Sequence, residues 1–295
     1  MNYGLFHLIC RWEIPLIKKL INKIKPEIER IGSVELSENT FELVLSAALV
    51  KSYGLTRVFI NAEDSSDAYF MLGSLRGVCE DFIVLAFLQK MNQEDRNAFV
   101  STFMKLKLQE SLDKQCNFFK KEKKDQIILN PSAGSDAVIA ECKEKIKEIG
   151  ERTEFWKGNS MPRVSDMAKC LGLQHFYQYL YALSSETVHF SPRMLFRMGW
   201  GGNAEQFQFS TKNFAGYYQQ YGMVYSSLLF IRFSREFKDT LKISNKLLMV
   251  VTELECKLND MLRWPEHITH EEMNLRAPDI FQQVVYRRGI ESLDS

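Results

Sequence analysis

The sequence has little glycine, little proline and no apolar stretch long enough to cross a membrane. Its 295 residues include 15 glycines and 7 prolines, and this shortage of turn-forming residues disfavours folds made of many short strands. The longest uninterrupted apolar stretch has seven residues, from Phe82 to Leu88, whereas a membrane helix needs about 18. We therefore expect long helices and no membrane span.

Neither positive nor negative charge predominates. The 38 basic residues nearly balance the 37 acidic ones, which leaves a formal net charge of +1. A protein that binds DNA or a membrane through bulk charge needs a strong positive excess, so any such contact must use a local patch. The length and the 45% of apolar residues instead predict a folded protein with one large domain or two.

Cysteine pairs and the common cofactor motifs are also missing. The six cysteines form no C-x-x-C motif, so we expect reduced thiols in a cytoplasmic protein. The sequence contains no glycine-rich phosphate loop and no H-E-x-x-H motif. His267 and His270 have a spacing that suits a metal, but Thr269 and Glu272 explain the same segment as the start of a helix. We expect neither a metal nor any other cofactor.

Apolar residues recur along most of the chain with the period of amphipathic helices. The pattern predicts an all-α, multi-helix bundle with at most one small β-hairpin or ordered loop near residues 194–211. The predicted parts are an N-terminal amphipathic helix (1–27), the helical bundle core (28–262) and a tail of short helices (263–295).

Arg76 and Glu80 lie one turn apart on a helix that is predicted over about residues 65–90. The other residues of the same stripe are Tyr69, Leu72, Ile83 and Phe87. Burying an unpaired charge costs several kcal/mol, so both charges need partners. The pattern fits a buried structural ion pair, and it also fits a pair that holds or polarises groups in a cleft between helices.

A second set of polar residues lies on the predicted helix 173–189. The residues that share or adjoin one face of it are Tyr177, Tyr181, Ser184, Ser185 and His189. The helix dipole favours the charged form of a histidine at a helix C-terminus. His189 either caps the last carbonyls of this helix or transfers a proton while facing Arg76 and Glu80.

These residues carry a resemblance to known proteins. The motif L-R-x-x-x-E stands at residues 75–80, and a tyrosine-rich helix that ends in S-x-x-x-x-H and is followed by proline stands at 177–192. Over roughly residues 40–195 the chain resembles an uncharacterised bacterial family of helical proteins. It is also distantly similar to the HEPN group of helical bundles, which are found in toxins and antiviral defence proteins.

The ribonucleases of the HEPN group use an arginine and a histidine on one helix, with the arginine first and four to six residues between the two. In this chain the positions where that arginine would stand, 182–184, hold Ala182, Leu183 and Ser184. An arginine from elsewhere would have to replace it. Arg76 is the main candidate, and Arg193 and Arg197 follow the histidine.

The resemblance implies a cytoplasmic protein of a prokaryotic defence or toxin system, either a metal-independent ribonuclease or a nucleotide-binding protein. In this hypothesis His189 is the general acid/base, Arg76 stabilises the phosphorane charge and Glu80 orients Arg76. Tyr177, Tyr181, Ser184 and Ser185 complete the pocket. The expected partners are RNA or a nucleotide, a protein of the same defence system and a second copy in a homodimer. The alternative is a non-catalytic helical binding or scaffold module in which the arginine, glutamate and histidine form a buried network.

Overall fold

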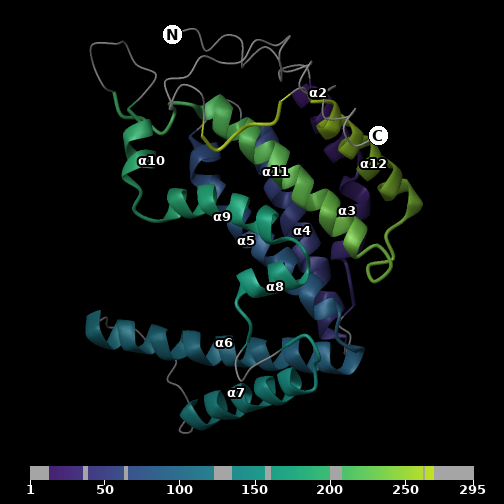
Figure 1. The fold of residues 1–295 in the computed structure, drawn as a ribbon, viewed down its shortest axis with the longest axis vertical. Coiled ribbons are helices and arrows are strands. Elements are labelled where there is room, and N and C mark those ends of the chain that lie inside the picture. Colours follow the sequence, from purple (N-terminus) through teal and green to yellow (C-terminus); the bar gives the residue numbers. More distant parts are fainter. Residues whose placement is uncertain are drawn as a thin grey trace. The chain divides into compact units, whose positions relative to one another are not determined.

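The computed structural model describes residues 13–35, 39–62, 66–122, 135–156, 161–199, 208–261 and 263–268, and all regular elements in these ranges are helices (Figure 1). The helices are α2 (Glu13–Lys23), α3 (Lys25–Gly32), α4 (Thr40–Asn61), α5 (Asp67–Gln89), α6 (Gln93–Glu122), α7 (Ser135–Glu151), α8 (Val164–Cys170), α9 (Gln174–Val188), α10 (Pro192–Arg197), α11 (Ala215–Glu236) and α12 (Asn245–Asp260). The predicted all-α fold class is confirmed.

The helices belong to two compact units, each built from separate stretches of the chain. The first unit takes its described residues from 1–33, 46–79 and 179–295, and the second takes them from 34–45 and 80–178. The division into consecutive parts at residues 27 and 262 stays a prediction.

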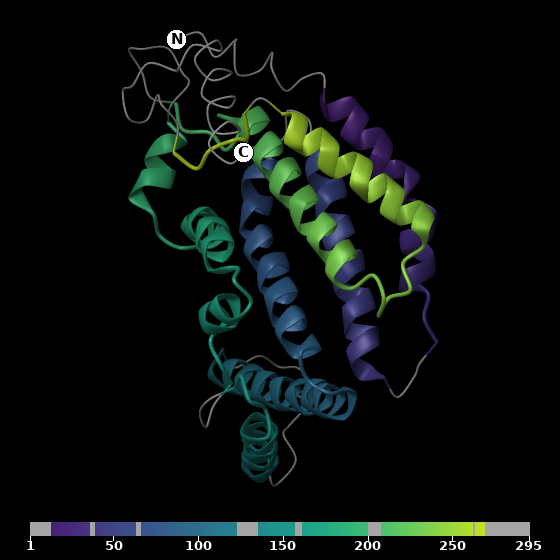
Figure 2. The same ribbon diagram turned by 45° about the vertical axis from the view of Figure 1, so that its right-hand side comes forward.

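The first unit is organised around α11, whose residues are mostly buried. Figure 2 shows α12 between α11 and α2, and α12 packs against both of these helices. α4 approaches α11 closely, because a Cβ atom at Gly222 would lie 2.1 Å from the ring of Phe59. The hydroxyl of Tyr53 on α4 donates to the carbonyl oxygen of Ile21 on α2 at 3.2 Å. These contacts hold the helices of the first unit around one apolar core.

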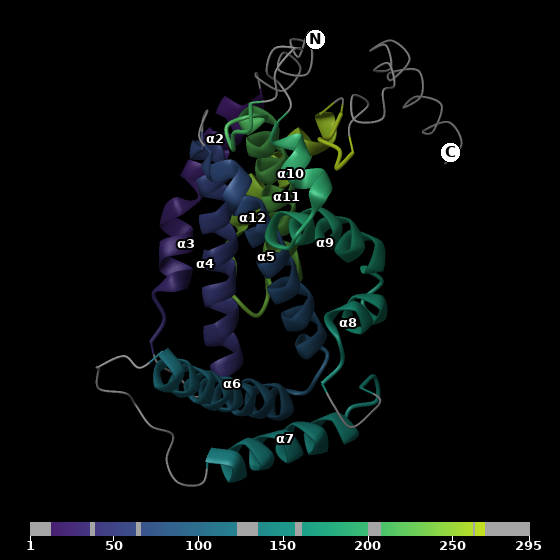
Figure 3. The same cartoon turned by 90° about the vertical axis from the view of Figure 1, so that its left-hand side faces the viewer.

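The second unit contains the pair α6 and α7, which lie side by side (Figure 3). Asn92 and Asp95 cap the start of α6 reciprocally: the backbone N–H of Asp95 donates to Asn92 Oδ1 and Asn92 Nδ2 donates to Asp95 Oδ2, both at 2.8 Å. Arg152, just after α7, donates to Asp95 Oδ1 at 2.6 Å. This hydrogen bond, followed by that from Asn92, lowers the pKa of Asp95 against the opposing effect of burial. The start of α6 and the end of α7 are thereby joined.

The sequence predicted either a β-hairpin or an ordered loop near residues 194–211, and the structure has a helix at the start of this region. Residues 192–197 form α10, with Pro192 at its start and the Ser191 hydroxyl accepting from the backbone N–H of Met194 at 3.4 Å. The N–H of Ser210 donates to the carbonyl oxygen of Met198 at 3.0 Å and closes the connection between the two described ends. A strand over residues 194–197 is therefore wrong, and the described residues after α10 form turns and irregular backbone. Residues 200–207 lie outside them.

Among the described residues, α4 is the one helix long and apolar enough to cross a membrane. In the structure 56% of its most apolar 18-residue stretch is buried inside the protein. Core helices of soluble proteins also have this length and composition. The lack of a membrane span and the cytoplasmic location stay predictions.

Candidate functional site

The candidate site lies in the first unit, where α5 passes close to the end of α9. A Cβ atom at Gly73 would lie 2.5 Å from Cγ2 of Val188, which is shorter than any ordinary contact. Glycine therefore allows α5 to approach α9 here more closely than any other residue would. Arg76 follows Gly73 by three residues and shares its face of α5, and His189 directly follows Val188. The close approach thus brings Arg76 and His189 to one place.

Arg76 contacts two of the residues that the sequence assigns to the site. Its Nη1 lies 3.4 Å from Nε2 of His189, at an exposed position. Its guanidinium carbon lies 4.4 Å from the centroid of the Tyr181 ring, a distance typical of cation–π contacts. α5 and α9 therefore contact one another, as the sequence analysis expected of these two helices. Solvent reaches Arg76, Tyr181 and His189.

Glu80 and Tyr177 belong to the second unit and contact one another. The Tyr177 hydroxyl donates to Glu80 Oε1 at 3.5 Å. Glu80 and Arg76 are both half-buried. Solvent therefore reaches both charges more than it would in a fully buried ion pair. The direct pairing of Arg76 with Glu80 and the orienting role of Glu80 stay predictions.

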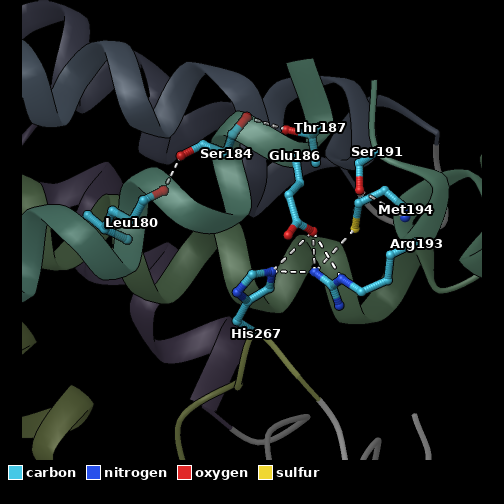
Figure 4. Close-up of polar contacts among 8 residues, drawn as sticks. All are labelled: Leu180, Ser184, Glu186, Thr187, Ser191, Arg193, Met194 and His267. Carbon is cyan, nitrogen blue, oxygen red and sulfur yellow. Dashed lines mark hydrogen bonds and ion pairs between the residues drawn. The ribbon is translucent and has the colours of Figure 1, made fainter. Parts of the chain in front are cut away.

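The two serines of α9 differ in their surroundings. Ser184 is buried, and its hydroxyl donates to the carbonyl oxygen of Leu180 one turn earlier (Figure 4). Thr187 Oγ1 donates to the carbonyl oxygen of Ser184 at 2.8 Å. These bonds place the Ser184 side chain within its own helix, whereas Ser185 is half-buried and its carbonyl oxygen accepts from the N–H of His189 at 2.9 Å. Ser185 is thus the better placed of the two serines to line a pocket.

A second polar cluster, formed by Glu186, Arg193 and His267, was not predicted from the sequence (Figure 4). Arg193 donates from Nε to Glu186 Oε2 at 3.0 Å, and its Nη2 contacts both Glu186 Oε2 and His267 Nε2. His267 Nε2 lies 3.6 Å from Glu186 Oε2. The sequence singled out His267 only for its spacing to His270, which lies outside the described residues.

The segment 263–268 carries His267 to this cluster. The carbonyl oxygen of Pro265 accepts from the hydroxyls of Tyr225 at 2.9 Å and Tyr179 at 3.4 Å. The Trp264 indole packs edge-on against Tyr225, and its N–H donates to the carbonyl oxygen of Leu258 at 2.8 Å. We call this segment the strap; it is fixed to α9, α11 and the end of α12.

The surroundings of His267 disfavour its protonated form. Burial is the largest cause of its lowered pKa, and the positive charges of Arg193 and Arg197 act in the same direction. Glu186 opposes them. Arg197 is itself buried, and its guanidinium lies 4.6 Å from the centroid of the Tyr217 ring. The imidazole of His267 is therefore neutral at neutral pH, with a lone pair on the nitrogen that contacts Arg193.

Within the described part of the chain, no group of three His, Cys, Asp or Glu side chains is arranged to hold a metal ion. His270 and Glu271 lie outside the described residues. The sequence-based expectation of no metal and no cofactor stays a prediction.

Comparison with known proteins finds a family whose model matches more than half of the chain. Residues 42–206 match the model of one protein family, which is described as a family of unknown function. No curated protein and no solved structure matches the chain. The matched stretch contains Arg76 and His189 but not His267, and it confirms the expected membership in an uncharacterised helical family.

Proposed function

The chain belongs to DUF5677, a family of unknown function, and we propose that it is a HEPN-like, metal-independent ribonuclease. The proposal places it in the cytoplasm as part of a prokaryotic defence or toxin system. The observation that supports it is the solvent-exposed contact between Arg76 Nη1 and His189 Nε2 at 3.4 Å. A guanidinium and an imidazole are the two groups that cleavage of RNA without a metal needs, one for charge and one for the proton.

The Arg76–His189 contact prepares both side chains for a phosphate. When Arg76 donates to Nε2 of His189, that nitrogen holds a lone pair and the ring proton is on Nδ1. Phosphate oxygens are stronger acceptors for a guanidinium than a neutral imidazole is, because the bond is charge-assisted at both ends. An arriving phosphodiester therefore takes the N–H of Arg76 and leaves Nε2 of His189 available to the substrate.

The reaction uses the hydroxyl that RNA has and DNA lacks. The 2′-oxygen attacks the adjacent phosphorus, the bond from phosphorus to the 5′-oxygen breaks, and one proton moves overall from the 2′-oxygen to the 5′-oxygen. His189 takes part in the proton transfer, and Arg76 stabilises the negative charge that develops on the phosphorus oxygens. The products are a 2′,3′-cyclic phosphate and a 5′-hydroxyl. Tyr181 keeps the guanidinium of Arg76 in place by packing against it.

Exposed aromatic residues close to His189 in the sequence favour a single-stranded substrate. Phe190 follows His189 directly and is 85% exposed, and Phe196 on α10 is 55% exposed. Unpaired bases stack on such rings, and each stacked base contributes about 1–3 kcal/mol to binding. Single-stranded RNA is therefore the proposed substrate class, with a single nucleotide as a smaller ligand of the same chemistry.

The test is cleavage of a single-stranded RNA oligonucleotide by the purified chain in the presence of a chelator. We expect 2′,3′-cyclic phosphate ends and a loss of at least about 100-fold in rate for His189→Asn, because proton transfer by a positioned side chain contributes about 10²–10⁴-fold. His175→Asn is the matched control, since His175 is an exposed histidine in the first turn of α9. Intact RNA with the wild-type protein, or equal rates for the two variants, would contradict the proposal.

A non-catalytic binding module is the second candidate function, and one observation favours it. Exposed apolar side chains occur at the end of α9 and on the following α10: Val188, Phe190, Leu195 and Phe196. Contiguous exposed apolar residues are typical of protein interfaces. In this alternative the patch binds a second copy of the chain or another protein of the same system. A chain that leaves RNA intact but forms a dimer that Phe190→Asp dissociates would support this alternative.

A further inference from the structure

The end of α9 carries two arginine–histidine pairs of the same kind. In the first, Arg76 Nη1 faces His189 Nε2, and in the second, Arg193 Nη2 faces His267 Nε2. Glu186 Oε2 contacts both members of the second pair. Glu186 lies on the last turn of α9, and His189 follows the helix with its N–H still bonded to the carbonyl oxygen of Ser185. Residues three apart in such a turn have Cβ atoms roughly 5–6 Å apart. The second pair therefore adjoins the first within one helical turn.

Separate contacts hold the backbone segment around His267 and its side chain in place. The strap is fixed at Pro265 by two tyrosine hydroxyls, and the imidazole is fixed by Glu186 and Arg193 (Figure 4). A proton-transferring residue has to be kept within a fraction of an ångström of its working position. The contacts of the strap fulfil this requirement for a residue that is 78 positions away from His189 in the sequence.

The two histidines differ in burial, and this difference separates their roles. His267 is largely buried and faces Glu186 from α9 and Arg193 and Arg197 from α10, whereas His189 is exposed at the end of its helix. Burial and the two arginine charges keep His267 neutral. A neutral imidazole accepts a proton. His189 is in contact with solvent, which can supply the proton that a general acid gives up.

Cleavage of a phosphodiester needs one group that takes a proton and another that gives one, because the attacking and leaving oxygens lie on opposite sides of phosphorus. We infer that His267 is the general base that accepts the 2′-hydroxyl proton and that His189 is the general acid that protonates the leaving 5′-oxygen. This inference rests on the proposed function and assigns its two proton transfers to two residues.

The step balances as follows. The proton of the 2′-hydroxyl passes to Nε2 of His267, and the bond from the 2′-oxygen to phosphorus forms. The bond from phosphorus to the 5′-oxygen breaks, and that oxygen takes the proton of the His189 imidazolium. His267 ends protonated and His189 neutral, and exchange with water restores both. Arg76 and Arg193 move from the imidazoles to the phosphate oxygens when the substrate binds, before the step, and Nε2 of His189 then takes a proton from water.

Two substrates that differ in the leaving group separate the two roles. The first is an RNA dinucleotide, whose 5′-oxygen needs a proton to leave. The second is uridine 3′-(p-nitrophenyl phosphate), whose p-nitrophenolate leaves without one. We expect His189→Asn to lose about 100-fold or more on the dinucleotide but less than about 10-fold on the aryl ester. We expect His267→Asn to lose about 100-fold or more on both substrates, with His175→Asn unchanged on both.

The pH dependence provides a readout that a purely structural role of His267 would not change. A general base must be deprotonated, so kcat/KM of the wild-type protein falls on the acidic side as His267 is protonated. This acidic limb disappears in His267→Asn if His267 is the base, and it persists at a lower overall rate if His267 only holds the strap. Loss of the limb supports the inference, and its persistence overturns it.

The failure of this inference is distinguishable from that of the proposed function. If the wild-type protein cleaves both substrates and His267→Asn cleaves them at the rate of His175→Asn, the role of His267 is wrong and the ribonuclease stands. If the aryl ester rescues His267→Asn but not His189→Asn, the assignment of base and acid is overturned. If the wild-type protein cleaves neither substrate, the proposed function and this inference fall together.

Discussion

Arg76 is the residue of the candidate site that is charged, reached by solvent and in contact with two other site residues. Its guanidinium lies over the ring of Tyr181 and also reaches His189. A planar, permanently charged group can keep both contacts and still present N–H donors to a phosphate. Lysine has the charge but neither the plane nor the fork of donors, so the two residues are not interchangeable here.

We expect Arg76→Lys and Arg76→Ala both to lose at least about 100-fold in RNA cleavage, because each removes the paired donors that stabilise the phosphorane. We expect Arg76→Ala to lower the free energy of unfolding by only about 1 kcal/mol, since a cation–π contact at an exposed site contributes about 0.5–1 kcal/mol. Cleavage rates and urea unfolding of both variants test this expectation. A loss of several kcal/mol would instead show that Glu80 is left unpaired in the core, as a buried ion pair predicts.

Gly73 shows how the meeting of two helices depends on one missing side chain. In an isolated helix, alanine is more favourable than glycine by roughly 1 kcal/mol. Glycine at this position is therefore unfavourable for α5 by itself, and the contact with Val188 on α9 explains why it is tolerated. The same contact sets the distance between Arg76 and His189.

We expect Gly73→Ala to reduce RNA cleavage at least about 10-fold while the protein still folds. The new methyl group would overlap Cγ2 of Val188, so α9 shifts and the 3.4 Å contact between Arg76 and His189 is lost. The double variant Gly73→Ala/Val188→Ala should recover most of the rate, because it removes the overlapping methyl groups of Val188. Val188→Ala alone is the control, since Val188 is exposed. Equal rates for Gly73→Ala and the wild-type protein would show that the helix contact does not position the site.

The helices themselves could be predicted from the sequence, because apolar periodicity is a local property. The expected helices at about 65–90 and 173–189 correspond to α5 (Asp67–Gln89) and α9 (Gln174–Val188). The strand alternative near residue 194 was wrong because Ser191 and Pro192 begin a helix, a signal present in the sequence but outweighed by the apolar pattern.

The site could be predicted only where its residues lie on faces with a recognisable pattern. Arg76, Tyr181 and His189 were found in this way. The contact between Glu186 and His267 could not be predicted, because the two residues are 81 positions apart. Apolar periodicity describes one helix at a time and does not show which distant segment packs on it. Tyrosine hydroxyls that bind one carbonyl oxygen decide where the strap lies, and this contact leaves no pattern in the sequence.

The whole chain has almost no net charge, so attraction of RNA depends on where the cations are rather than on how many there are. Arg76 contacts His189 and Arg193 contacts Glu186, so both arginines lie near the last turn of α9. Such a site contacts only a few phosphates, so we expect its affinity for RNA to fall with salt concentration only as steeply as that small number of contacts requires. The family match over residues 42–206 covers parts of both units, whereas the strap that carries His267 lies beyond it.

At the level of the cell, the proposed function predicts that the active chain is toxic. A metal-independent ribonuclease with an open site and a neutral overall charge has nothing in its chemistry that restricts it to one RNA, so unregulated synthesis should degrade the RNA of the host. We expect induced expression of the wild-type chain in a bacterial host to arrest growth and to yield RNA fragments with 2′,3′-cyclic phosphate ends. His189→Asn should grow normally at equal protein levels, and His175→Asn should arrest growth like the wild type.

Because a defence system can hold such an enzyme inactive until it is triggered, the same strains are compared with the neighbouring genes of the system present and with phage added. Normal growth and intact RNA under all of these conditions would contradict the ribonuclease and leave the binding module, for which dimer formation through Phe190 is the measurement that decides.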